Sequence, residues 1–178
     1  MRYAALLRGI NVGGNKKVAM AQLRELLAEL GYTDVATILN SGNAVFTSPQ
    51  EDPQALGRAI AAGIEDRFAM SVSVVIRTAA ELAAALRSSP LPGEPENPSR
   101  FFVAFLSARP TAGAIRAIEA QSFDPDRIWV SGHEAYLWCP VGAADTLLTN
   151  TFIEKNLGVT ATSRNWNTVT KLAGLAGG

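Results

Sequence analysis

The residues best suited to chemistry lie in one glycine-rich loop near the start of the chain, in the segment RGINVGGNKK. Gly13 and Gly14 allow the backbone to approach a ligand closely and to adopt positive φ. Arg8, Lys16 and Lys17 bring positive charge. Arg8 also has the planar donor geometry that binds a phosphate or carboxylate through two hydrogen bonds. The loop therefore has the composition of an anion-binding site.

The element that follows the loop strengthens this interpretation. Apolar residues recur at helical spacing from Ala19 to Leu30, and Gly31 ends the pattern. The unpaired N–H groups and the dipole at the start of a helix favour negative charge. Asn11 and Asn15 add neutral hydrogen-bond donors. We expect the loop and the helix start to hold an anion together.

Two well-known phosphate motifs do not fit this loop. Gly9 and Gly14 have the separation found in a Walker A motif, but Asn15 precedes the lysine and no Ser or Thr follows it. The dinucleotide fingerprint is excluded because its third glycine is missing. The structural alternative is that the glycines and asparagines simply build a left-handed turn.

A second polar turn is expected to lie beside the loop. Ser41, Gly42 and Asn43 separate two apolar strands, a composition typical of a hairpin turn. In a β-α-β-β-α-β unit, the third strand lies between the first two and runs antiparallel to both. The end of the first strand then meets the start of the third. Ser41 and Asn43 become further candidate ligand-binding residues.

The chain contains this β-α-β-β-α-β order twice. DVATILNSGNAVF and DRIWVSGHEAYLW both place a Ser-Gly-polar turn between two strands, and a tandem duplication explains the repeated order. We predict an α+β fold made of two ferredoxin-like units, each an antiparallel sheet with helices packed on one face. The predicted boundaries are 1–78 for the first half, 79–99 for a short helix and Pro-rich linker, and 100–178 for the second half with a C-terminal helix.

Three segments carry a family resemblance: LLRGINVGGNKKVAM, ELGYTDVATILNSGNAVF and TSRNWNTVTKL. With them the chain resembles a bacterial family catalogued as domain of unknown function 1697, whose members often have proline at the position of Ala19. The resemblance implies two ferredoxin-like halves. It implies no reaction, substrate or cofactor.

The C-terminal segment offers a second set of candidates. Arg164, Asn165 and Lys171 either complete the anion site or tie the last helix to the fold through hydrogen bonds. We favour the structural role, because the neighbouring Trp166 is a natural packing anchor.

Other reactive groups are sparse. His133 lacks Cys or His neighbours in the sequence and is a poor metal ligand, and Cys139 alternates with core residues. Asp124 and Asp126 flank a proline and are interpreted as turn residues. No acid–base or nucleophile–base pair is evident, so we predict no metal site and no cofactor, and leave enzymatic activity open.

Tyr136 and Trp138 share a strand face with Glu134, which argues against deep burial of that face. Packing between halves or subunits is favoured over a stacked base, since the RNA-recognition consensus is absent.

Bulk properties narrow the function classes. The single cysteine excludes an intrachain disulfide, no segment is apolar enough to cross a membrane, and the N-terminus does not resemble a signal peptide. A cytoplasmic protein without membrane contact is expected. The net charge is zero, although residues 1–24 and 155–178 contain basic residues and no acidic ones. Nucleic-acid binding is therefore less favoured.

We expect a binding module for an anionic small molecule, phosphorylated or carboxylated, at the Arg8–Lys17 loop and the Ser41–Asn43 turn. An enzyme with its site at the same edge is one alternative. A nucleic-acid-binding or protein-interaction module is another, and a homo-oligomer is compatible with the sequence.

Overall fold

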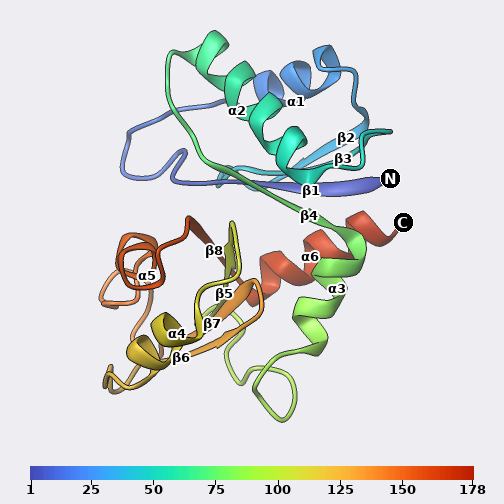
Figure 1. Cartoon of the computed structure of the whole chain (residues 1–178). Coiled ribbons are helices and arrows are strands. Elements are labelled where there is room, and N and C mark those ends of the chain that lie inside the picture. Colours follow the sequence, from blue (N-terminus) through green and yellow to red (C-terminus); the bar gives the residue numbers. More distant parts are fainter. The chain divides into compact units, whose positions relative to one another are not determined.

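The computed structural model describes residues 1–178, the whole chain. Its elements follow the expected order, including the short helix between the two repeats, α3 (Figure 1). They are β1 (Arg2–Leu7), α1 (Met20–Glu29), β2 (Thr33–Ile38), β3 (Asn43–Thr47), α2 (Pro53–Phe68), β4 (Val74–Thr78), α3 (Ala79–Arg87), β5 (Phe101–Leu106), α4 (Ala112–Glu119), β6 (Arg127–Ser131), β7 (Glu134–Trp138), α5 (Asn150–Leu157), β8 (Ala161–Asn165) and α6 (Trp166–Gly177).

The chain divides into two compact units. The first comprises Met1–Ala83 together with Lys171–Gly178, and the second comprises Ala84–Thr170. The end of α6 thus belongs with the first unit, where the Arg2 guanidinium donates from Nε to the Leu175 carbonyl oxygen at 2.8 Å. The proposed boundaries placed all of 100–178 in the second half.

Each unit has the predicted sheet. The strand orders are β2-β3-β1-β4 and β6-β7-β5-β8, and all pairings are antiparallel. The middle strands therefore pair as a split β-α-β arrangement requires. The predicted α+β fold of two ferredoxin-like halves is confirmed.

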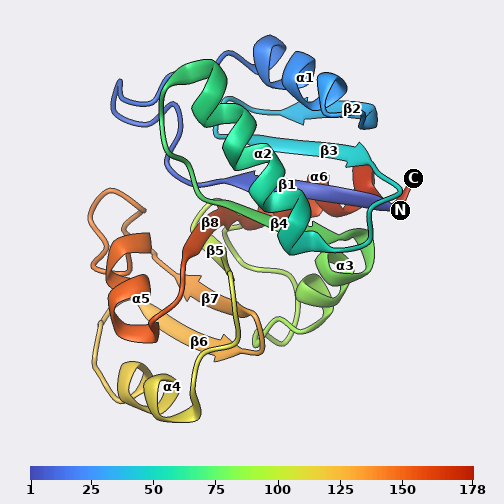
Figure 2. The same ribbon diagram turned by 45° about the horizontal axis from the view of Figure 1, so that its top comes forward.

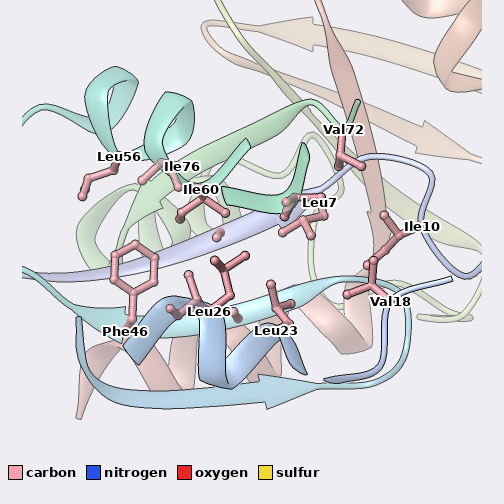
Figure 3. Close-up of a cluster of buried hydrophobic side chains, with 14 of the residues drawn as sticks. Leu7, Ile10, Val18, Leu23, Leu26, Phe46, Leu56, Ile60, Val72 and Ile76 are labelled. Atoms are coloured by element: carbon pink, nitrogen blue, oxygen red, sulfur yellow. The ribbon is translucent and has the colours of Figure 1, made fainter. Parts of the chain in front are cut away.

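Alternating side chains of β1 form the core of the first unit. Tyr3, Ala5 and Leu7 are fully buried on the face covered by α1 and α2. Figure 2 shows both helices on the same side of this sheet. The buried residues drawn in Figure 3 converge between the helices and the strands. Burial of this apolar face is the main stabilising contribution to the unit.

The second unit repeats this plan. Ala104 and Leu106 of β5 pack with residues of α4 and α5, among them Ile118 and Ile153. The helix starts are set by side-chain caps, because Thr111 accepts the Ala114 N–H at 3.2 Å and caps α4.

α5 begins later than its apolar pattern suggests. The apolar residues Leu147 and Leu148 precede the helix, and α5 begins only at Asn150. The Thr149 hydroxyl accepts the Phe152 N–H at 3.2 Å, so this residue is the cap and fixes the first turn.

The other face of the second sheet is covered, contrary to the expectation from Glu134. Tyr136 is 1% exposed, and its hydroxyl donates to the Ala85 carbonyl oxygen of α3 at 2.7 Å. Phe101 stacks on Tyr136 and also contacts Trp166 of α6. The ring of Tyr136 is thus a core group and offers no platform for a base.

The Pro-rich stretch is held by hydrogen bonds within the second unit. The Trp166 indole N–H donates to the Glu94 carboxylate at 2.8 Å, and the Trp166 backbone N–H donates to the Pro98 carbonyl at 3.2 Å. Trp166 therefore acts as the packing anchor that its size suggests. No helix of the structure combines the length and hydropathy that crossing a bilayer requires.

Candidate anion-binding site

The strand order brings the glycine-rich loop beside the polar turn. Leu6 of β1 and Ile38 of β2 both pair with Asn43, the first residue of β3. The Leu7 N–H then donates to the Gly42 carbonyl at 2.9 Å. The loop that leaves β1 and the turn that precedes β3 consequently lie next to each other, at the same end of the strands of this sheet.

Asn11 fastens the loop to both neighbours. Its Nδ2 donates to the carbonyl oxygens of Val18 at 2.8 Å and Asn40 at 2.6 Å, while its Oδ1 accepts the Val18 N–H at 2.9 Å. The residue has φ of 54°, a left-handed conformation that Asn tolerates well. Asn11 is thus an internal clamp, and its polar atoms are directed at the protein.

An apolar residue fills the space beneath the loop. Ile10 is fully buried, and Figure 3 shows it next to Val18 at one end of the first unit's core. A Cβ added to Gly42 would lie 2.8 Å from Ile10 and from Leu7. Since Gly42 also has φ of 83°, both the turn and the close packing require glycine there.

The two remaining turn residues, Ser41 and Asn43, differ in burial. Asn43 is 0% exposed and donates from Nδ2 to the Ile38 carbonyl at 3.0 Å and the Ser41 hydroxyl at 2.9 Å. Asn43 therefore shapes the edge from within, whereas Ser41 is half-buried.

The three cations of the loop have different surroundings. Lys16 donates from Nζ to the Ser71 carbonyl at 2.8 Å, which ties its ammonium to the backbone. Arg8 is half-buried, and its backbone N–H donates to the Ser73 carbonyl at 2.9 Å. Lys17 is exposed and lines a surface pocket. Of the three cations, Lys17 is thus the one that contributes its charge directly to the pocket.

The loop tip is a left-handed turn, as its composition indicates. Gly13 and Gly14 have φ of 61° and 79°, and Val12 pairs with Asn15 in an isolated bridge. All four residues are exposed. A Cβ on either glycine would meet nothing within 4 Å, so the space above them is open.

Helix α1 begins beside this turn without a side-chain cap. Ala19 holds the N-cap position, makes no capping hydrogen bond, and no acidic residue stands in the first turn. The first helical bond runs from the Leu23 N–H to the Ala19 carbonyl at 3.0 Å, so the N–H groups of Met20, Ala21 and Gln22 precede the ladder. By contrast, Asp52 caps α2 and Thr78 with Glu81 caps α3.

A surface pocket of about 410 Å³ joins these features. Its lining consists of Asn11, Gly14, Lys17, Val18, Ala19 and Asn40. Val18 and Asn40 were not among the sequence candidates. Asn40 could have been identified from its position directly before Ser41, whereas nothing in the sequence distinguishes Val18 from other apolar residues. Lys17 is the one ionisable side chain in this lining.

The C-terminal candidates have mainly structural contacts. Arg164 is 7% exposed and donates to the Thr162 hydroxyl at 2.8 Å and the Ser163 carbonyl at 2.9 Å. Burial lowers the pKa of Arg164 to about 10, which leaves it charged at neutral pH. Asn165 accepts the Thr168 N–H at 3.0 Å and so caps α6. Lys171 is exposed and belongs to the first unit.

Comparison with known proteins places the chain in a family. A family model described as protein of unknown function (DUF1697) matches residues 1–136. The chain belongs to this family. Of the three segments that suggested the DUF1697 resemblance, the first two lie within the matched residues and TSRNWNTVTKL lies beyond them.

A solved structure has the same fold. It is described as the structure of conserved bacterial protein SP0830 from Streptococcus pneumoniae. The TM-score is 0.74 at 24% sequence identity, and the match covers 98% of each chain. This likeness supports the fold of the DUF1697 chain. No curated protein matches the sequence.

Proposed function

We propose that this DUF1697 protein is a binding module for a small phosphorylated or carboxylated molecule, held at the start of α1. The observation that carries the proposal is the uncapped N-terminus of α1, which adjoins a pocket whose ionisable residue is Lys17. The partial positive charge of the helix start and the ammonium of Lys17 attract the same anion. The proposed setting is the cytoplasm, since a chain with one cysteine needs no oxidising compartment.

The candidate residues divide into two roles in this proposal. Lys17 and the first N–H groups of α1 contact the anion, and Gly14 leaves space for it. Asn11 and Asn43 hold the loop and the turn in place through the internal bonds described above. Lys16 supports the loop through its bond to Ser71.

Three variants test the proposal in a calorimetric titration with inorganic phosphate, sugar phosphates, nucleotides and small carboxylates. Lys17→Ala should weaken binding of the hit by about tenfold, because a charge-assisted hydrogen bond is lost. Arg58→Ala is the matched control, since it removes one exposed positive charge elsewhere in the same unit. It should leave the affinity within about twofold.

Ala19→Asp is the most demanding variant. It places a carboxylate at the N-cap, where it can accept the first N–H groups of α1 and occupy the position proposed for the anion. The variant should be more stable by about 1 kcal/mol and should no longer bind the hit. If Ala19→Asp folds and still binds normally, the anion lies elsewhere and the proposal is wrong.

A further inference from the structure

Asp126, in the second unit, has an unsatisfied buried oxygen. The residue is 8% exposed, and its Oδ2 accepts the Thr146 hydroxyl at 2.5 Å. Its Oδ1 is buried and has no hydrogen-bond partner. A buried carboxylate oxygen without a partner costs free energy, so a hydrogen-bond donor that binds this oxygen would stabilise the arrangement.

The structure holds Asp126 in this position from several sides. Its backbone N–H donates to the Phe123 carbonyl at 2.8 Å. The Thr146 hydroxyl that binds Oδ2 also accepts the Leu148 N–H at 3.0 Å. These bonds fix the carboxyl group while leaving Oδ1 without a donor of its own.

Asp126 forms part of the wall of a surface pocket of about 300 Å³. The lining includes the carboxylates of Glu119, Asp124 and Asp126 and a single cation, Arg127. The excess of negative charge favours a cationic ligand. Glu119 also uses Oε1 to accept the Val130 N–H at 2.8 Å, which holds the end of α4 against β6.

The chemistry of the wall favours an organic cation over a bare metal ion. No three carboxylate, histidine or cysteine side chains are grouped closely enough to hold a metal. Calcium needs six to eight oxygen ligands, and the orphaned Oδ1 supplies one. Phe123 and Trp129 also line the pocket, and aromatic faces attract ammonium and guanidinium groups.

We propose that this pocket binds an organic cation with N–H donors, a primary ammonium or a guanidinium, whose hydrogen bond completes Asp126 Oδ1. The site lies in the second unit and selects the opposite charge from the anion site of the first. The oxygen itself is covered. Binding therefore requires an adjustment of exposed side chains in the wall, such as Gln121 and Ser122.

The test uses the full chain and follows the indole N–H resonance of Trp129 by NMR, assigned with Trp129→Phe. Butylammonium chloride should give a saturable shift. Sodium chloride at equal ionic strength should give none. Tetramethylammonium has the charge but no N–H donor, and should bind at least about tenfold more weakly if a hydrogen bond to Asp126 is formed.

Asp126→Asn should reduce butylammonium affinity by about tenfold or more, since the charge and the matched acceptor are both removed. The isosteric amide should leave the fold intact, as burying a neutral group costs less than burying a charge. Asp145→Asn is the control, because it removes an exposed carboxylate outside the pocket, and its affinity should be unchanged. Should Asp126→Asn fail to fold, Asp124→Asn replaces an exposed wall residue and should weaken binding by about threefold.

A peptide with a single lysine distinguishes the source of the cation. Binding of the peptide as tight as that of butylammonium would identify a protein side chain, and binding of butylammonium alone would identify a free amine. The absence of any saturable shift would overturn the proposal and mean that an ordered water satisfies Asp126. Equal affinities of Asp126→Asn and Asp145→Asn, or of butylammonium and tetramethylammonium, would also overturn it.

Discussion

Replacing Asn11 with alanine removes the clamp of the glycine-rich loop. The side chain forms three hydrogen bonds, two to Val18 and one to Asn40, with distances from 2.6 to 2.9 Å. The alanine methyl group can replace none of them. The loop should therefore detach from the turn while the sheet, which does not depend on these bonds, stays folded.

The magnitude follows from the contacts. Each net hydrogen bond contributes about 1 kcal/mol, which gives about 2–3 kcal/mol for the three together. Alanine also tolerates the observed φ of 54° less well than Asn, at a cost of about 1 kcal/mol. Asn11→Gly removes the bonds but accepts this backbone conformation, so the difference between the two variants measures the conformational part.

Native-state hydrogen exchange is the appropriate assay, because the loop can open without global unfolding. The Val18 N–H donates to Asn11 Oδ1 and reports directly on the clamp. The combined loss of about 3–4 kcal/mol for Asn11→Ala lowers the protection of this amide by roughly 100- to 1,000-fold. Amides in the centre of β1, such as that of Ala5, should change little.

Asn15→Ala is the matched control, since Asn15 is an exposed residue of the same type in the same loop. In this variant the hydrogen-exchange protection of the Val18 amide should stay within about twofold of its value in the unmodified protein, as is usual for surface substitutions. If Asn11→Ala and Asn15→Ala give the same protection at Val18, the clamp does not hold the loop and the reasoning is refuted.

Three further substitutions test the packing and the caps. Gly42→Ala should destabilise the first unit by about 2 kcal/mol or more in urea unfolding, because residue 42 has a positive φ and the added methyl group would clash with Ile10. A destabilisation below about 0.5 kcal/mol would contradict this. Burial raises the pKa of Tyr136 to about 12, so the stabilising contribution of its protonated hydroxyl is present below pH 10 and is lost as the pH rises towards 12. Tyr136→Phe should therefore show a shallower decline of stability across that range. A decline identical to that of the unmodified protein would exclude this residue as the cause. Glu81→Gln should cost about 0.5 kcal/mol of stability, because the capping box with Thr78 loses its charge-assisted bonds but keeps an acceptor, and a stabilising effect would contradict the cap.

The sequence was most informative where local rules and topology agree. The split β-α-β-β-α-β order requires the third strand to pair with the first two, and this pairing alone predicts that the loop beginning at Arg8 lies beside Ser41. Caps such as Asp52 and the Thr78–Glu81 pair follow from residue types at fixed spacing. These features depend on few residues and on no long-range packing.

The remainder depends on tertiary contacts that spacing does not reveal. Ile10 lies within the glycine-rich loop and gives no periodic signal, yet it is fully buried against Gly42. Tyr136 shares a strand face with Glu134, but α3 supplies both cover and a hydrogen-bond acceptor for its hydroxyl. Since α3 lies outside the repeated unit, the duplication itself does not predict that the second sheet is covered there.

The two halves share a frame and differ in the loops that could bind ligands. Between β1 and α1 the first half has the long loop Arg8–Ala19, whereas the equivalent connection in the second half is the short segment Ser107–Thr111. Between α4 and β6 the second half has the acidic segment Ala120–Asp126, against Leu30–Tyr32 in the first.

In their own sheets, these two loops lie at opposite ends of the strands. The first leaves the end of strand one of its repeat, and the second enters the start of strand two, which runs parallel to strand one because both are antiparallel to strand three. Function in this fold is therefore expected from the connections that differ, since the repeated strands and helices are used for core packing in both units. A ligand that binds at α1 need not have a counterpart in the second unit, and the connection Leu30–Tyr32 of the first unit has no acidic residue in the place of Asp126.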